Sequence, residues 1–359
     1  MGKNLAKRKI ELVEMSGTHY EMGLQYGSTC PKIKEMVRMM IQNLEMDLTQ
    51  VKAFTNKYAL SIQGYDPEIM DEIRGIAKGA GVDLEEILFL CAWYEMAIHK
   101  FVTSLPGCTS FAAMGDATVD GELFIGQNMD IYPAIEDKLI LLKMKPNKGP
   151  DILALTIVGA VGLIGINSEG ISVNGNLLMH RNYVSPIGIV PHNVISRKTM
   201  SANNLSKVIS SIALAKRGPA VNQLFGSSQG DVIDVEVTPD DLGFVYPVDG
   251  ILTHANNFVT ERFKSGDIAS AFVPDSFIRI KRLDTLMREH KGRLSIELMK
   301  KLLQDHNNYP DSICRHADEE LPPNMRMKTV ASIITSPKER KMHIALGNPC
   351  QNEYVEYSL

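Results

Sequence analysis

A glycine–cysteine dipeptide, Gly107-Cys108, is the feature of this sequence best suited to covalent chemistry. Gly107 has no side chain, so the peptide bond that joins it to Cys108 can be approached closely and distorted. Cys108 supplies a thiol, which is a strong nucleophile once it is ionised. If the bond between the two residues were cut, Cys108 would also carry a free α-amino group. That amine has a reference pKa of roughly 7.7–8.0, which suits a general base at neutral pH.

This combination is the logic of N-terminal-nucleophile (Ntn) hydrolases, and the chain resembles one family of them. It is similar to the acyl-coenzyme A:6-aminopenicillanate acyltransferases and their amidase relatives. The segments that carry the resemblance follow one another in order along nearly the whole chain: 17–23, 72–80, 107–109, 126–130, 165–170, 173–176, 253–256 and 308–315. The resemblance implies cleavage of the Gly107–Cys108 bond by Cys108 itself, followed by acyl transfer from a small amide.

Several further residues are assigned to the site by this resemblance. Asn256, Asn176 and Asn174 are candidate donors to a developing oxyanion, and Asn174 and Asn176 would face the same side of an extended strand. Asp130 could hold the new α-ammonium group or orient Cys108, and Arg315 could favour the thiolate or pair with Asp130. Three lesser assignments complete the set: assistance to self-cleavage by Ser110, pocket shape by Met129, and a hydrogen bond within its own loop by Ser312.

The elements that must hold these residues are predicted from pattern. Residues 1 to about 105 are expected to be mostly helical, with helix starts near Thr18, at Asp66-Pro67 and at Asp83. From Cys108 onward, apolar strands alternate with helices at 191–200, 205–215, 275–290 and 294–303. Asp120-Gly121 predicts a hairpin. Blocks of strands between blocks of helices indicate an α+β layered fold. The resemblance makes this an αββα sandwich of four layers with two antiparallel sheets.

The family resemblance also predicts the domain organisation. Residues 1–107 are expected to be cut from residues 108–359 and to stay associated with them, the two parts together forming one structural domain.

Composition excludes several other classes of protein. The chain of 359 residues has a net charge of −4, which argues against a broad nucleic-acid footprint. No apolar run approaches the ~20 residues of a membrane span, and the basic start lacks the apolar core of a signal peptide, so a cytoplasmic location is expected. The histidines and the five cysteines show no HExxH, CxxC or paired spacing, so no metal is expected. No cofactor is expected either, although a coenzyme A thioester stays open as an acyl donor.

Two alternatives to a self-processing amidohydrolase or acyltransferase remain. Cys108 could work within an uncut chain with a histidine such as His254 as base. The chain could also be a non-enzymatic binding protein that retains the fold. The substrates expected for the enzyme are linear amides, N-acyl amino compounds and β-lactam side chains.

Overall fold

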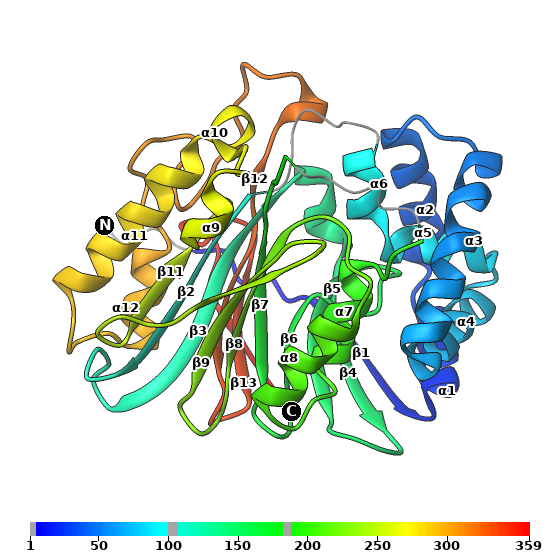
Figure 1. Cartoon of the computed structure of the whole chain (residues 1–359), viewed down its shortest axis with the longest axis horizontal. Coiled ribbons are helices and arrows are strands. Elements are labelled where there is room, and N and C mark those ends of the chain that lie inside the picture. Colours follow the sequence, from blue (N-terminus) through cyan, green and yellow to red (C-terminus); the bar gives the residue numbers. More distant parts are fainter. Residues whose placement is uncertain (1–4, 100–106, 182–187) are drawn as a thin grey trace.

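Two β-sheets packed face to face carry the residues of interest (Figure 1). The computed structural model describes residues 5–99, 107–181 and 188–359. The larger sheet has eight strands in the order β1-β4-β5-β6-β7-β8-β9-β10, which are Glu11–Gly17, Leu139–Pro146, Ile152–Ile157, Ile164–Asn167, Ser172–Leu177, Val221–Gly226, Val232–Val237 and Leu242–Val245. The smaller has six in the order β11-β2-β3-β12-β13-β14, which are Ile251–His254, Gly107–Gly115, Gly121–Ile131, Lys328–Ser336, Lys341–Leu346 and Val355–Ser358.

Helices cover the outer face of each sheet, which completes the four layers (Figure 1). One group lies with the eight-stranded sheet: α1 to α8, at His19–Thr29, Lys32–Asn43, Leu48–Tyr65, Pro67–Ala80, Leu84–Cys91, Trp93–His99, His192–Thr199 and Leu205–Leu214. The other lies beside the six-stranded sheet: α9 to α12, at Glu261–Lys264, Ala269–Phe272, Asp275–Glu289 and Ile296–Leu302. The predicted αββα fold class is confirmed. Among the described helices, none combines the length and apolar character needed to cross a membrane.

One strand pair departs from the predicted antiparallel arrangement. Strand β1 runs parallel to β4, with Glu11 opposite Ile140, whereas every other described strand pair is antiparallel. The segment before Cys108 therefore contributes a strand as well as helices. Its apolar residues Val13 and Met15 belong to the same core cluster as Leu141 and Met144 of β4.

The N-terminal helices start where the sequence predicts. The Thr18 hydroxyl accepts from the Glu21 N–H, and the Glu21 carboxylate accepts from the Thr18 N–H, which is a capping box. Asp66 caps α4 by accepting from two backbone N–H groups. Helices α1 and α4 pack closely against each other at glycine residues. A Cβ on Gly23 would lie only 2.0 Å from the carbonyl oxygen of Glu72, so a larger residue would not fit there. The equivalent approach is made by Gly27, Gly75 and Gly79.

The hairpin β2–β3 fixes the position of Cys108. Gly107 pairs with Asp130, and Cys108 pairs with Met129. Because side chains alternate along a strand, Cys108 and Ser110 point between the two sheets, whereas Thr109 and Phe111 point toward α11 and α12. The predicted hairpin at Asp120-Gly121 is confirmed. Residues 100–106, the end of the predicted N-terminal fragment, lie outside the described residues.

Candidate active site

Cys108 is the second residue of β2, and both of its backbone groups are bonded to side chains. Its N–H donates to Asn256 Oδ1 at 2.9 Å, and its carbonyl oxygen accepts from Arg279 Nη1 at 2.6 Å. The residue is 6% exposed. The N–H of the peptide on which the predicted cleavage depends is therefore held by Asn256, just after β11, and the next peptide group is held by Arg279 of α11.

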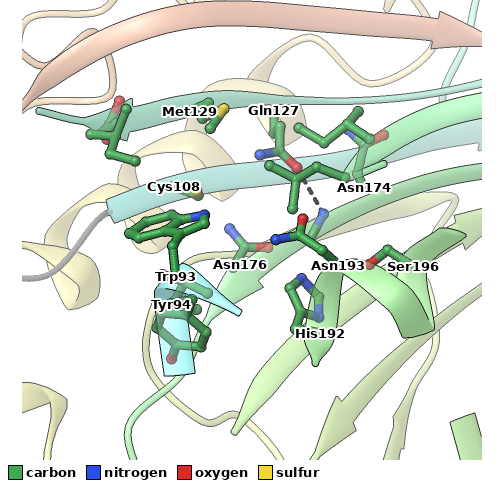
Figure 2. Close-up of a pocket in the computed structure, with 16 residues that line it drawn as sticks. Trp93, Tyr94, Cys108, Gln127, Met129, Asn174, Asn176, His192, Asn193 and Ser196 are labelled. Carbon is green, nitrogen blue, oxygen red and sulfur yellow. Dashed lines mark hydrogen bonds between the residues drawn. The ribbon is translucent and has the colours of Figure 1, made fainter. Parts of the chain in front are cut away.

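The Cys108 side chain lines a pocket between the two sheets whose empty space, open mouth included, is about 560 Å³ (Figure 2). Trp93 and Tyr94 of α6 form the wall beside Cys108, and His192, Asn193 and Ser196 of α7 form the opposite side (Figure 2). The remaining lining comes from Leu163, which precedes β6, and from strands β3, β6 and β7: Gln127, Met129, Asp130, Ile131, Ile164, Asn174, Gly175, Asn176 and Leu177. The Gln127 carboxamide accepts from the Gly175 N–H at 2.8 Å, which ties the sheets together across the pocket.

Buried polar atoms without a partner gather at this pocket. Within the described parts of the chain, Asn174 has neither its Oδ1 nor its Nδ2 hydrogen-bonded, and the same holds for Asn176 Nδ2, Asp130 Oδ2 and His192 Nδ1. Such a group costs roughly 1–3 kcal/mol when left unpaired, so a cluster of them indicates a place where a polar ligand is bound. The predicted common face of Asn174 and Asn176 is confirmed, because both line this pocket.

Ser110 orients the carboxamide of Asn176. The Ser110 hydroxyl donates to Asn176 Oδ1 at 2.7 Å, and Asn222 Nδ2 donates to the same oxygen at 3.2 Å. With two donors on its oxygen, the amide presents its nitrogen to the pocket. Ser110 therefore acts on the site through Asn176.

Asn256 is turned the other way. Its Oδ1 accepts from Cys108 N–H and from Arg279 Nη2, both at 2.9 Å, while its Nδ2 donates to the Leu177 carbonyl. From the sequence, this amide was a candidate oxyanion donor. In the structure its oxygen accepts from the Cys108 nitrogen instead. The Cys108 N–H and the Arg279 guanidinium both donate to Oδ1, so they hold the oxygen of the amide toward β2.

Four charged side chains surround the Gly107–Cys108 peptide. A Cβ built on Gly107 would lie 3.2 Å from Arg315 Nη1, 3.4 Å from Arg279 Nη2 and 3.5 Å from Asp130 Oδ2. Asp275 joins the two arginines, at 2.7 Å from Arg279 Nε and 3.4 Å from Arg315 Nη1. Asp130 was one candidate partner for Arg315, but the ion pairs of Arg315 are with Asp275 and Asp311.

Burial controls the protonation of the two reactive groups. It raises the pKa of the Cys108 thiol to about 12, and the negative field of Asp130 adds to that shift. Burial also raises the pKa of Asp130 to about 6, although Arg279 and Arg315 act in the opposite direction. The uncut chain therefore holds Cys108 as a thiol at neutral pH beside an ionised Asp130, and a base is needed before the sulfur can attack.

Arg279 is the main site residue that the sequence analysis missed. Its fully buried guanidinium donates to the Cys108 carbonyl, the Thr109 hydroxyl, Asn256 and Asp275. Asp275 and Arg279 stand four residues apart, so they lie on one face of helix α11. The sequence therefore contained a signal for Arg279: two oppositely charged residues, Asp275 and Arg279, on one face of a predicted helix.

His254, the alternative base, is bound to groups other than Cys108. Its Nε2 is 2.9 Å from Glu236 Oε1 and its Nδ1 is 2.9 Å from the Ala255 carbonyl, so both ring nitrogens are occupied. Ser312 also lies outside the pocket lining, and its hydroxyl donates to the Cys314 carbonyl in its own loop at 2.7 Å.

Comparison with known proteins agrees with this geometry. The family model described as acyl-coenzyme A:6-aminopenicillanic acid acyl-transferase matches residues 117–351. The 40 kDa form of acyl-coenzyme A:6-aminopenicillanic-acid-acyltransferase from Emericella nidulans is 30% identical over 284 residues, which are 79% of this chain and 76% of that protein. The chain belongs to this acyltransferase family. The family prediction is confirmed, and with it the class of enzyme, which transfers or hydrolyses acyl groups.

Two more distant similarities were found. An uncharacterized protein of Archaeoglobus fulgidus is 24% identical over 366 residues, covering 87% of this chain and 60% of that protein. The solved structure of an N-acylethanolamine-hydrolyzing acid amidase ortholog from Caenorhabditis elegans aligns with a TM-score of 0.46 at 13% identity, covering 64% of this chain and 93% of that one.

Proposed function

We propose that this member of the family is a self-processing Ntn cysteine amidohydrolase or acyltransferase. Cys108 Sγ attacks the Gly107 carbonyl, the C–N bond to Cys108 breaks, and the thiol proton passes to the departing nitrogen. Water then hydrolyses the resulting thioester, which leaves a Gly107 carboxylate and a free Cys108 thiol and α-amine. The two fragments, residues 1–107 and 108–359, stay together through their common core.

The second stage uses the same sulfur on a substrate. The α-amine takes the thiol proton, the thiolate attacks an amide carbonyl, and the amine part leaves with a proton. The thioester that remains on Cys108 is passed to water or to an acceptor amine. Hydrolysis is favoured over transfer, because water is always present and no described feature selects coenzyme A.

One observation carries this proposal: the Cys108 nitrogen is already bound by a side chain rather than only by the neighbouring strand. Asn256 Oδ1 accepts from that nitrogen, and Asp130 Oδ2, an unpaired acceptor, lies 3.5 Å from a Cβ built on the adjacent Gly107. A nitrogen that becomes an ammonium group needs acceptors of this kind. Across the pocket, the unpaired Asn176 Nδ2 is available to a developing oxyanion.

The pocket suggests the substrate class. The Trp93, Met129 and Leu163 side chains offer an apolar wall suited to an acyl chain, and Asn174 offers an unpaired carboxamide to the polar part of an amide. Small linear amides, N-acyl amino compounds and β-lactam side chains fit that description.

Intact-mass analysis of purified wild type tests the processing step. We expect two fragments that meet between Gly107 and Cys108, followed by turnover of at least one compound in a panel of N-acyl amines, with and without acyl-coenzyme A donors. An uncut chain that hydrolyses the panel would favour internal catalysis instead. An uncut chain that binds the panel without turnover would favour a binding protein.

Replacing Asn176 by alanine removes the unpaired amide donor from the pocket. We expect kcat to fall by about 10²–10³, the usual loss for one oxyanion donor, with little change in KM. Asn222→Ala is the matched control, since it removes a partner of Asn176 Oδ1 but leaves Nδ2 in place. Steady-state kinetics on the processed enzymes checks this. Equal losses in both variants would assign Asn176 a packing role.

Asp130 predicts a pH dependence of stability in the uncut protein. Its pKa is about 6 in the folded chain and 3.8 as a free side chain, so the folded state binds the proton more tightly and loses stability as pH rises through this range. Between pH 4 and 7 the expected loss is roughly 2 kcal/mol. Asp130→Asn should abolish this part of the pH dependence when urea unfolding is compared in the Cys108→Ala background.

Asp275→Asn is the control for that comparison, because Asp275 has a lowered pKa. Its contribution to stability is present above pH 3.8 and is lost only as pH falls below that value, so the difference between pH 4 and 7 should be small. If the Cys108→Ala proteins with and without Asp130→Asn keep a constant difference in unfolding free energy across pH 4–7, Asp130 does not titrate as proposed.

A further inference from the structure

Four side chains with metal-binding chemistry converge on one point away from the pocket. His306, Cys314 and His316 come from the long connection between α12 and β12, and Cys350 comes from the turn after β13. One ligand atom from each lies within 4.8 Å of all the others. Imidazole nitrogens and thiolates in the ratio two to two are the donor set of structural zinc sites.

The distances between these atoms are close to the edges of a coordination tetrahedron. Zn–S bonds of about 2.3 Å and Zn–N bonds of about 2.05 Å imply edges of about 3.8 Å for S–S, 3.6 Å for S–N and 3.3 Å for N–N. The structure has 3.6 Å between Cys314 Sγ and Cys350 Sγ, and 3.8 and 3.4 Å from these sulfurs to His316 Nε2. His306 Nε2 and His316 Nε2 are 3.0 Å apart.

We propose that His306, Cys314, His316 and Cys350 bind one Zn²⁺ ion as a structural site. Four protein ligands fill a tetrahedron and leave no open position, so the ion would hold the fold rather than bind substrate. Two thiolates with two imidazoles favour zinc over magnesium or calcium, which prefer oxygen ligands. Binding releases the two thiol protons to solvent.

Neighbouring groups support this arrangement. Asn348 Nδ2 lies 3.5 Å from Cys314 Sγ and donates to the Arg315 carbonyl at 2.7 Å, so it can hold a thiolate while fixing the backbone beside it. The ring of Tyr309 packs against both histidine rings, with centroids 5.3 Å from His316 and 6.3 Å from His306. Cys314 is buried and His306 is exposed, which leaves a path for the ion from solvent.

The proposed zinc site is connected to the surroundings of Gly107 by the peptide bond between Cys314 and Arg315. Cys314 directly precedes Arg315, whose guanidinium lies beside Gly107, and the Arg315 backbone pairs with Thr329. The Thr329 hydroxyl in turn donates to Asp130 Oδ1 at 2.7 Å. Zinc would therefore fasten the loop that carries Arg315 to the end of β13.

No metal was expected from the sequence, because the chain has no short, paired spacing of histidines or cysteines. His306, Cys314 and His316 are eight and two residues apart, and Cys350 is far along the chain, so only folding brings the set together. The competing interpretation of the two sulfurs is a disulfide. Both thiols are free at a separation of 3.6 Å, against about 2.05 Å in a disulfide.

Metal analysis of the purified full-length protein, with thiols kept reduced, tests the proposal. We expect about one zinc per chain, and Co²⁺ added to chelator-treated protein should give the visible and near-ultraviolet bands of tetrahedral thiolate coordination. Cys350→Ser and His306→Gln should each weaken zinc binding at least tenfold. His290→Gln, a histidine at the end of α11, should bind as wild type does. Chelation should lower the Tm of wild type by several degrees and leave that of His306→Gln unchanged.

Failure of this proposal is distinct from failure of the proposed enzyme. Cys108→Ala should retain full zinc binding, because Cys108 is not part of the cluster. Wild type that neither contains zinc nor takes up Co²⁺ would overturn the site. So would undiminished binding by both ligand variants, or a Cys314–Cys350 disulfide that persists in a reducing buffer.

Discussion

Cys108→Ala is expected to give a single uncut chain of 359 residues with no acyl transfer activity. In the proposed mechanism this sulfur attacks Gly107 and then the substrate, so its removal should stop both stages at once. Loss of a nucleophile costs on the order of 10⁶ in kcat in a well-studied hydrolase, and a loss of at least ~10⁵ is expected here. Intact mass and product formation from the best amide of the panel are the two measurements.

The control for that result is another buried cysteine. Cys30→Ala removes a thiol that packs in the N-terminal core, and the pKa of this thiol is raised by burial to about 11. It should process and turn over substrate like wild type. Cleavage at Gly107 in the Cys108→Ala protein would show that another group, or a contaminating protease, cuts the chain.

The strand-and-turn chemistry around Cys108 could be predicted from local pattern. The alternation of strand side chains places Cys108 and Ser110 on one face, and it does the same for Asn174 and Asn176, so their meeting across the two sheets needs only the sheet packing that the family resemblance implied. Helix starts at Thr18 and Asp66 were equally readable, because capping depends on residues three or four apart.

Long-range pairings could not be predicted in the same way. Strand β1 reaches β4 across more than a hundred residues, and nothing in its short apolar pattern marks it as a parallel partner. Strands β8 and β14 were also missed. In β8 the polar residues Asn222 and Gln223 interrupt the apolar run. Both are buried, and their side chains donate hydrogen bonds to Asn176 and Ser196, partners that only the folded structure supplies. The His306–Cys350 cluster needed the same kind of tertiary information.

Arg279 presents the sharpest test of how the site is held in place. It is 1% exposed, and it connects helix α11 to the first residues of β2 through the Cys108 carbonyl and the Thr109 hydroxyl. Arg279→Met keeps most of the side-chain volume but leaves the buried Asp275 with Arg315 as its remaining cation at 3.4 Å. Removing one member of a buried ion pair costs about 3–5 kcal/mol, so a loss of that size in unfolding free energy is expected.

The same change should also slow self-cleavage, because Asn256, which accepts from the Cys108 N–H, loses a donor to its Oδ1, and the Cys108 carbonyl in the next peptide group loses its donor. Urea unfolding in the Cys108→Ala background isolates the stability effect, and the half-time of fragment appearance measures the other. Arg282→Met is the matched control, since that arginine lies on the same helix with its side chain 36% exposed and paired to Asp305, and a loss below about 1 kcal/mol is expected. Arg279→Lys keeps the charge but cannot supply the guanidinium's several fixed donors, so it should fall between the two. Equal losses for Arg279→Met and Arg282→Met would mean that the start of β2 is held by the sheet alone and that the buried charges around Gly107 are not what fixes the scissile peptide.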